Sequence, residues 1–143
     1  SHVLPALIRK FHEAELKGEN VQVWGTGNAR REFLHVDDLA DACVFILKNV
    51  EAKDIFSSGV SHINIGSGED ITIKELCDAI ALAVGYRKDT HKQILFDLSK
   101  PDGTLKKLMD ISRLKNLGWR AKIDLGKGLA STYRWYKENC HET

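Results

Sequence analysis

The hydrophobic positions of this chain recur at helical spacing in five stretches. Leu4, Leu7, Ile8 and Phe11 share one face of a helix that we predict to end near Gly18. The same spacing, with its start and stop signals, predicts further helices through residues 39–47, 73–85, 110–118 (capped by Asp110) and about 125–139.

Polar residues mark where the longer helices begin and end. Asp37 or Asp38 precedes the apolar run of the second helix and is predicted to cap its first turn. Thr72 and Glu75 have the form of a capping box, in which each side chain accepts a hydrogen bond from the backbone of the other residue. Gly85 then offers a left-handed end to that helix.

Short extended runs separate these helices. Residues 21–24, 32–36, 62–65 and 93–96 are predicted to be strands. Strands that alternate with helices favour parallel pairing in at least part of a sheet. The pattern therefore predicts an α/β fold with about five helices and four short strands.

Composition narrows the class of protein. The 143 residues fit one domain, and 43% hydrophobic with 29% charged residues predicts a packed core rather than a disordered chain. The formal net charge of +1 argues against nucleic-acid binding through a global basic field, although it leaves room for a local anion site. No apolar run is long enough for a membrane span. The chain begins at Ser1 without methionine, so we expect a fragment of a longer protein.

Cysteine and histidine usage gives no sign of a disulfide framework or a metal site. Cys43, Cys77 and Cys140 are odd in number and far apart, which is typical of reduced thiols in a cytoplasmic protein. The six histidines lack the paired spacing of zinc ligands, so no bound metal is expected.

Two glycine pairs invite comparison with a dinucleotide-binding loop. Gly25–Gly27 and Gly66–Gly68 both supply the first two glycines of a GxGxxG fingerprint, but Arg30 and Ile71 stand at the third position. A strand rather than a helix is predicted after the first pair. Both pairs are therefore interpreted as ordinary turns.

The spacing of Tyr133 and Lys137 matches the Tyr-x-x-x-Lys pair that short-chain dehydrogenases use to activate a tyrosine. Residues four apart share a face of any helix, so the spacing alone is weak. The place of the pair in the last helix favours a packing role.

Residues 23–40 form a more specific pattern, VWGTGNARREFLHVDDLA. It resembles the WGxGxxxREFLHVDDLA segment of GDP-L-fucose synthases, which belong to the NAD-dependent epimerase/dehydratase family of the extended short-chain dehydrogenase/reductase superfamily. The resemblance continues in the same order through residues 1–8, 62–66, 99–104, 107–110 and 128–133.

The resemblance implies that residues 1–143 are a single nucleotide-sugar-binding domain, the C-terminal part of such an enzyme. The N-terminal Rossmann half, with the family's cofactor loop and its catalytic Ser and Tyr-x-x-x-Lys, is not in the sequence. The resemblance implies that complete family members epimerise C3 and C5 of GDP-4-keto-6-deoxymannose by removing and returning protons beside the C4 ketone. NADPH then delivers a hydride to C4. We therefore expect no cofactor bound to this chain alone, and no NADPH turnover by it.

Several side chains in the matching segments suit a nucleotide sugar on chemical grounds. Lys10, Arg31 and Lys106 could supply cations to a diphosphate, and arginine offers a planar fork of donors for phosphate oxygens. Trp24 can present a flat face to a sugar or base. Asp102 can accept hydrogen bonds from sugar hydroxyls.

The resemblance assigns roles to five residues. It places His2 at the histidine that acts as acid and base during epimerisation. The family's substrate-contacting positions correspond to Lys10, Trp24, Arg31 and Asp102.

Two alternatives stay open at this stage. The chain could be a non-enzymatic module that self-associates, because residues 39–47 and 62–65 would expose apolar faces without the cofactor half. It could also be the C-terminal part of another nucleotide-sugar epimerase or dehydratase. A homodimer with a GDP-sugar as small-molecule partner is expected, with neither nucleic acid nor membrane.

Overall fold

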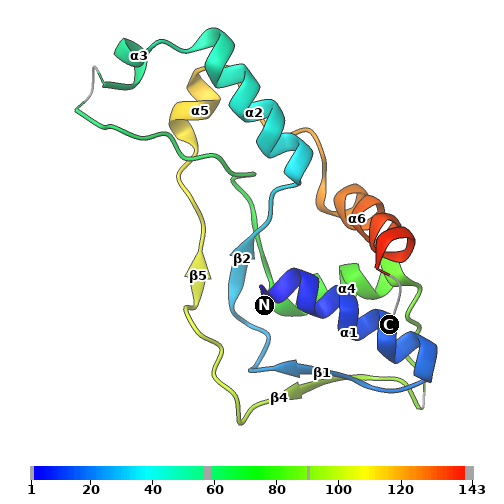
Figure 1. The fold of residues 1–143 in the computed structure, drawn as a ribbon. Helices are drawn as coiled ribbons and strands as arrows, with labels where there is room; N and C mark the ends of the chain where they lie inside the picture. Colours follow the sequence, from blue (N-terminus) through cyan, green and yellow to red (C-terminus); the bar gives the residue numbers. More distant parts are fainter. Residues whose placement is uncertain (1, 57–58, 90, 141–143) are drawn as a thin grey trace. The chain divides into compact units, whose positions relative to one another are not determined.

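The structure, a computed structural model, describes residues 2–56, 59–89 and 91–140 (Figure 1). Ser1, residues 57–58, Thr90 and residues 141–143 lie outside this description. The described helices are α1 (Val3–Lys17), α2 (Val36–Asn49), α3 (Ala52–Phe56), α4 (Ile73–Val84), α5 (Ser112–Asn116) and α6 (Leu125–Asn139). The strands are β1 (Val21–Trp24), β2 (Arg30–Glu32), β3 (Asp70–Thr72), β4 (Ile94–Asp97) and β5 (Lys106–Lys107).

Three helices confirm the sequence prediction because their end signals are local. α1 ends at Gly18, which adopts a left-handed conformation. Thr72 and Glu75 make both hydrogen bonds of the predicted capping box at the start of α4, and Gly85 ends that helix in the left-handed region. α6 has the predicted limits and buries Leu129.

The start of α2 differs from the prediction that Asp37 or Asp38 caps it. The N-cap is His35, whose Nδ1 accepts a hydrogen bond from the Asp37 backbone N–H at 3.2 Å. The strand predicted at residues 32–36 is misplaced, since β2 is Arg30–Glu32 and α2 already begins at Val36. Asp38 does not cap the helix, because its carboxylate accepts from the backbone N–H groups of Lys122 and Ile123.

The strand predicted at residues 62–65 is wrong, since these residues have no regular secondary structure. The Asn64 side chain donates to the Asp110 carbonyl at 3.0 Å, a contact that the apolar pattern does not reveal. α5 also begins later than predicted: Ile111 is its N-cap, while Asp110 accepts hydrogen bonds from the backbone and hydroxyl of Ser112. The sequence pattern also missed α3, β3 and β5, which are all short.

The strands form two small sheets. β1 and β4 pair in parallel, from Val21 opposite Ile94 to Trp24 opposite Asp97, which confirms parallel pairing in part of the fold. The other sheet has the order β3-β2-β5. Because β1 and β4 run in parallel, the loops that follow them, beginning at Gly25 and Leu98, leave the same end of the sheet.

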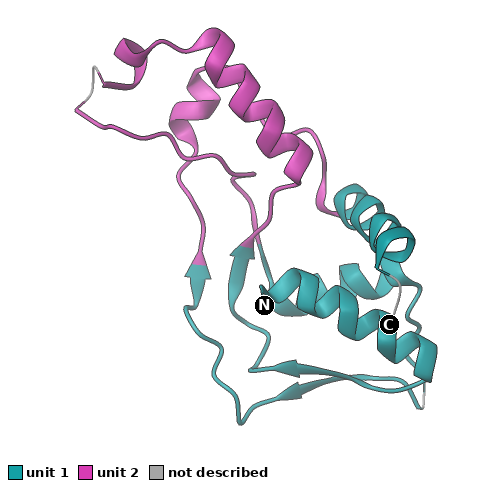
Figure 2. Ribbon diagram, viewed as in Figure 1, with its two compact units in different colours: residues 1–31, 71–106, 126–143 teal, residues 32–70, 107–125 magenta. Residues whose placement is uncertain are grey.

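The described chain divides into two compact units (Figure 2). Unit 1 comprises residues 1–31, 71–106 and 126–143, and in it α1 packs against α4 and β1. Phe11 and Ile80 are fully buried in its core, and the Phe11 ring meets the Tyr86 ring edge-on at a centroid distance of 5.3 Å.

Unit 2 comprises residues 32–70 and 107–125. Its core consists of buried Ala42, Leu114 and Trp119, with partly buried hydrophobic residues around them. The Trp119 indole N–H donates to the Asp41 carboxylate at 2.8 Å, so the polar edge of the buried ring is satisfied.

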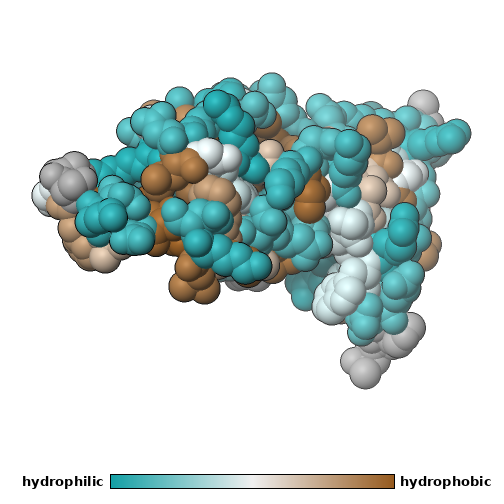
Figure 3. Space-filling model, turned by 90° about the horizontal axis from the view of Figure 1, so that it is seen from above, coloured by the Kyte–Doolittle hydropathy of each residue, from teal (hydrophilic) through white to brown (hydrophobic). Residues whose placement is uncertain are grey.

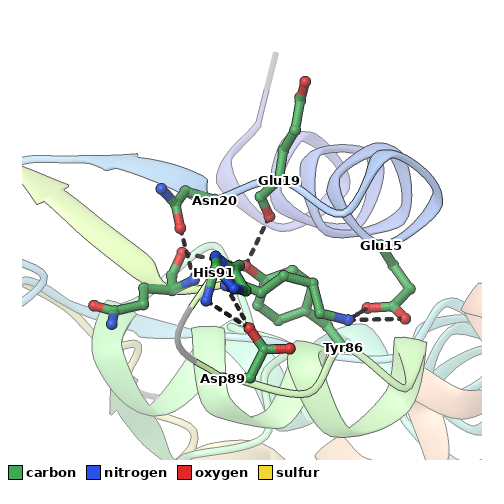
Figure 4. Close-up of polar contacts among 8 residues, drawn as sticks. Glu15, Glu19, Asn20, Tyr86, Asp89 and His91 are labelled. Carbon is green, nitrogen blue, oxygen red and sulfur yellow. Dashed lines mark hydrogen bonds and ion pairs between the residues drawn. The ribbon is translucent and has the colours of Figure 1, made fainter.

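A polar cluster in unit 1 fixes the segments before β1 and β4 (Figure 4). The Tyr86 hydroxyl lies within hydrogen-bond distance of the backbone carbonyls of Glu19 at 2.9 Å and Gln93 at 3.2 Å, and its one proton can be donated to either. The Asn20 side chain accepts from the Gln93 N–H at 2.8 Å, so the two segments are tied where the strands start to pair. Each of these groups has a structural partner, and the cluster is interpreted as a support for the sheet.

No described helix is both long and apolar enough to cross a membrane.

Candidate functional site

Trp24, at the end of β1, is the centre of the candidate site. Its side chain is 64% exposed. Side chains alternate along the strand, so Trp24 lies on the face opposite to the buried Val21 and Val23. The ammonium groups of Lys10 and Lys100 lie 5.7 and 5.8 Å from the centroid of its ring. Such distances are typical of cation–π contacts, so the indole is covered by two positive charges.

Lys10 reaches Trp24 from the middle of α1. Its ammonium donates to the Gln22 backbone carbonyl at 2.9 Å, which holds the charge beside β1. The structure therefore brings together two of the predicted site residues, Lys10 and Trp24, in unit 1.

Asp102 lies in the loop after β4, and its carboxylate binds the turn that follows Trp24. Its Oδ1 accepts from the Thr26 N–H at 2.7 Å and its Oδ2 accepts from the Thr26 hydroxyl at 2.7 Å. The hydrogen bond from the Thr26 hydroxyl is the largest cause that holds the pKa of Asp102 below its usual value. A carboxylate held at both oxygens has fewer lone pairs to offer a sugar.

Arg31, in β2, binds the far end of the same loop. Its Nη1 donates to the backbone carbonyls of Arg30 at 2.7 Å and Thr104 at 2.6 Å. Within the described part of the chain these bonds use Nη1 alone, so the Nε and Nη2 donors remain for a ligand. Lys106 is exposed in β5.

His2 precedes α1 and is exposed. Its backbone is extended, its carbonyl accepts from the Ala6 N–H at 3.2 Å, and its side chain makes no capping hydrogen bond. No contact with the other candidate residues is recorded for it within residues 2–56, 59–89 and 91–140, so its catalytic role remains a prediction from resemblance.

A cavity of about 500 Å³ lies elsewhere in unit 1. Its charged groups include Lys88 and Asp78, which pair with each other at 2.6 Å. Burial raises the pKa of the Cys77 thiol to about 12, so this sulfur is a poor nucleophile at neutral pH. The lining residues are Lys74, Cys77, Asp78, Lys88, Asp89, Gln93, Ile94 and Phe96, none of them a candidate site residue.

The two glycine turns do not fit a dinucleotide. A Cβ built on Gly25 would lie 2.2 Å from Asp102 Oδ1, and one on Gly27 would lie 2.4 Å from the Phe96 ring. Side chains of this protein therefore already fill the space next to these glycines that a pyrophosphate would need. The Glu32 carboxylate fills the corresponding place at Gly66, 2.3 Å from a built Cβ. These contacts support the interpretation of both glycine pairs as turns of the fold.

Tyr133 has the packing role that its position suggests. Its ring is 9% exposed, and its hydroxyl lies 2.9 Å from Nδ1 of His12. Burial raises the pKa of the Tyr133 phenol, which is opposite to the activation of a catalytic tyrosine, although the Lys137 ammonium lies 5.0 Å from the ring centroid.

No group of three metal-ligating side chains occurs in the described ranges.

The conspicuous segment around residues 31–38 also contains anchors that the sequence reasoning did not identify. The Glu32 carboxylate accepts from the backbone N–H groups of Gly68 at 2.7 Å and Met109 at 3.0 Å. The Asp38 side chain, 2% exposed, accepts from the N–H groups of Lys122 and Ile123. Both carboxylates hold distant loops of unit 2, so part of this motif is structural.

Comparison with known proteins gives concordant results. The family model of the NAD dependent epimerase/dehydratase family matches residues 1–66. GDP-L-fucose synthase 1 of Arabidopsis thaliana is 53% identical over 97% of this chain, and GDP-L-fucose synthase of Escherichia coli K12 is 49% identical over 97%. The structure of a GDP-mannoheptose C4 reductase from Campylobacter jejuni with NADP bound is 40% identical over 96% of the chain, with a TM-score of 0.82.

The chain spans only part of these proteins, 40% of the Arabidopsis sequence, 43% of the E. coli sequence and 45% of the C. jejuni chain. Over nearly its whole length the chain is similar to a portion of GDP-L-fucose synthases, which confirms the resemblance seen in residues 23–40. Residues 1–66 match the NAD dependent epimerase/dehydratase family, and the chain has the α/β fold of a portion of an extended short-chain dehydrogenase/reductase.

Proposed function

We propose that this chain binds a GDP-sugar of the 4-keto-6-deoxymannose type, as the substrate-binding part of a GDP-L-fucose synthase-like, NADP-dependent epimerase/reductase. The observation that carries the proposal is the exposed Trp24 ring with the Lys10 ammonium 5.7 Å from its centroid. Arg31 also supports the proposal. Its Nη1 binds the Thr104 carbonyl in the loop that Asp102 attaches to Thr26, and its Nε and Nη2 offer further donors to a phosphate.

The described side chains suit binding more than redox chemistry. Trp24 offers a flat apolar face, while Lys10 and Arg31 offer charge to a diphosphate. Binding energy from a remote nucleotide can hold the reacting sugar in place. His2 is proposed as the acid and base that moves protons at carbons beside the ketone, a task that histidine performs near neutral pH.

NADPH supplies the hydride in this family's reductions, and we expect this chain alone not to oxidise NADPH. A cytoplasmic location is also proposed, because Cys43, Cys77 and Cys140 are all free thiols.

Calorimetric titration with GDP, GDP-mannose and UDP tests the binding proposal. We expect GDP and GDP-mannose to bind, and Trp24→Ala to weaken both about tenfold, since stacking on an aromatic side chain contributes about 1–3 kcal/mol per base. Trp135→Ala is a matched control, because Trp135 is 60% exposed in α6 and Trp24 is 64% exposed. Binding of UDP in preference to GDP would favour another nucleotide-sugar enzyme, and equal loss in both variants would contradict the Trp24 role.

We also propose that the chain forms a homodimer through α2. Exposed apolar side chains lie on one face of this helix, including Val36 at 68%, Val44 at 49% and Leu47 at 85%. Figure 3 shows hydrophobic residues exposed at several places among hydrophilic ones on one face of the molecule. An apolar face of this kind is typical of an interaction surface.

Sedimentation velocity tests this second proposal. Leu47→Lys is expected to shift a dimer to monomer, because it places a charge in the apolar contact. Leu82→Lys on α4 is the control, since Leu82 is also 85% exposed. A wild-type chain that sediments as a monomer at high concentration contradicts the homodimer.

A further inference from the structure

The loop from Leu98 to Thr104 carries two charged side chains toward the end of β1. Asp102 binds Thr26, and the Lys100 ammonium lies 5.8 Å from the centroid of the Trp24 ring. The resemblance to GDP-L-fucose synthases assigns substrate contact to Asp102 and no role to Lys100. The geometry instead indicates that Asp102 attaches the loop to Thr26 and that Lys100 is the charged group beside the Trp24 ring.

Asp102 serves the turn at both of its oxygens. The backbone N–H and the hydroxyl of Thr26 donate to Oδ1 and Oδ2, each at 2.7 Å. The Thr26 hydroxyl also accepts from the Asn28 N–H at 3.2 Å, so its single proton is directed at Asp102. Gly25 leaves room for this contact, since a Cβ there would lie 2.2 Å from Oδ1.

The attachment of the loop has a consequence for Lys100. Asp102 holds the loop at Thr26, two residues beyond Trp24, and the Arg31 guanidinium holds its end at the Thr104 carbonyl. Lys100 stands between the end of β4 and these two attachments, and it is exposed.

Lys10 and Lys100 therefore place two positive charges on one exposed indole. Two ammonium groups near one exposed ring make its surroundings positive, which favours an anion bound there. Lys10 is held by the Gln22 carbonyl at 2.9 Å, whereas Lys100 comes from a loop on the other strand of the sheet. A phosphate group is an anion of suitable size and charge for two lysine ammonium groups.

We propose that Thr26 is a positioning residue that fixes this loop through Asp102, and that Lys100 is the residue of the loop that contacts the diphosphate of the ligand. The inference rests on the proposed function for its ligand, a nucleoside diphosphate. Asp102 acts in it as the anchor of the loop.

The pH dependence of the anchor follows from the same contacts. The Thr26 hydroxyl is the largest cause of the lowered pKa of Asp102, with further lowering from the backbone of Thr26 and Gly27 and from the Lys74 ammonium. Burial acts in the opposite direction. A carboxyl whose pKa is lower in the folded state stabilises that state above its ordinary pKa of 3.8, and the contribution is lost as the pH falls through the lowered value.

The anchor is tested by NMR titration of the Asp102 carboxyl carbon in the full chain. Thr26→Val removes the hydroxyl and keeps the shape, so the pKa of Asp102 is expected to rise toward its ordinary value. Thr26→Ser restores the hydroxyl and is expected to restore the lowered pKa. An Asp102 pKa that is the same in Thr26→Val and wild type overturns the anchor, whether or not a ligand binds.

The ligand contact is tested by titration with GDP and with inorganic pyrophosphate. Lys100→Met is expected to weaken both about tenfold, since hydrogen bonds to charged groups are among the stronger ones. Lys17→Met, on an exposed lysine at the end of α1, is the control and should bind like wild type. Thr26→Val should weaken both ligands as well, and Thr26→Ser should rescue them.

The outcomes separate this inference from the proposed function. If Trp24→Ala weakens GDP binding while Lys100→Met does not, the Lys100 contact is wrong and the binding function stands. If the wild-type chain binds neither GDP nor pyrophosphate, the proposed function and the Lys100 contact both fail. Circular dichroism of each variant shows that a loss of binding is not a loss of fold.

Discussion

Replacing Gly25 by alanine is expected to lower the free energy of unfolding by more than the cost of placing an alanine in a left-handed backbone conformation. Gly25 has φ +80°, a region that costs an L-residue roughly 1–2 kcal/mol. The new Cβ would also lie 2.2 Å from Asp102 Oδ1, so the carboxylate must shift, which disturbs its hydrogen bonds to Thr26. Urea unfolding followed by circular dichroism measures the loss.

Gly18→Ala separates the two causes. Gly18 has φ +68° and no heavy atom within 4 Å of a built Cβ, so it carries the conformational cost without the clash. We expect this control to lose about 1–2 kcal/mol. Gly25→Ala should also weaken GDP binding, whereas Gly18→Ala should not. Equal destabilisation in the two variants would show that the contact between Gly25 and Asp102 contributes nothing.

Asp38→Ala is expected to destabilise unit 2 by about 2–4 kcal/mol, because it removes a buried carboxylate and leaves two backbone N–H groups without their acceptor. The Asp38 carboxylate accepts from the Ile123 N–H at 2.9 Å and from the Lys122 N–H at 3.1 Å. Hydrogen exchange at these two amides should accelerate before the rest of the unit. Asp38→Asn keeps one acceptor oxygen and should lose less.

The neighbouring aspartate is the control for that experiment. The Asp37 side chain is 77% exposed, and its nearest ionisable partner is His35 at 3.6 Å. The His35 Nδ1 accepts from the Asp37 N–H and so does not also donate to this carboxylate. Substitution of an exposed side chain of this kind usually changes stability by about 0.5 kcal/mol or less, so Asp37→Ala should change stability little. A result in which Asp37→Ala costs as much as Asp38→Ala contradicts the anchoring role of Asp38.

Local signals account for the parts of the fold that the sequence predicted well. The capping box of Thr72 and Glu75, and the glycines that end α1 and α4, act within a few residues, so the amino-acid order reveals them. The apolar spacing located β1 at residues 21–24, with alternate burial. Residues 62–65 also alternate between polar and apolar but form no strand, because sheet pairing requires a partner that local pattern does not specify.

The candidate site was predicted in part for a similar reason. Resemblance named Lys10 and Trp24, and the structure brings them together. The partner of Asp102 is Thr26, far away in the sequence, and no spacing rule connects them. Asp38 was expected to cap a helix, since aspartate before an apolar run commonly does so. Its carboxylate instead accepts a hydrogen bond from the backbone N–H of Lys122.

The interleaving of the two units constrains how the protein can fold and how it can be divided. Unit 1 draws on three separate stretches of chain and unit 2 on two, so neither corresponds to one continuous segment. Val21 pairs with Ile94 only after the intervening chain has closed into a long loop, which carries an entropic penalty and slows folding. A single proteolytic cut therefore cannot release either unit intact. An N-terminal truncation that extends beyond residue 32, or a C-terminal one that begins before residue 125, is expected to remove part of both units.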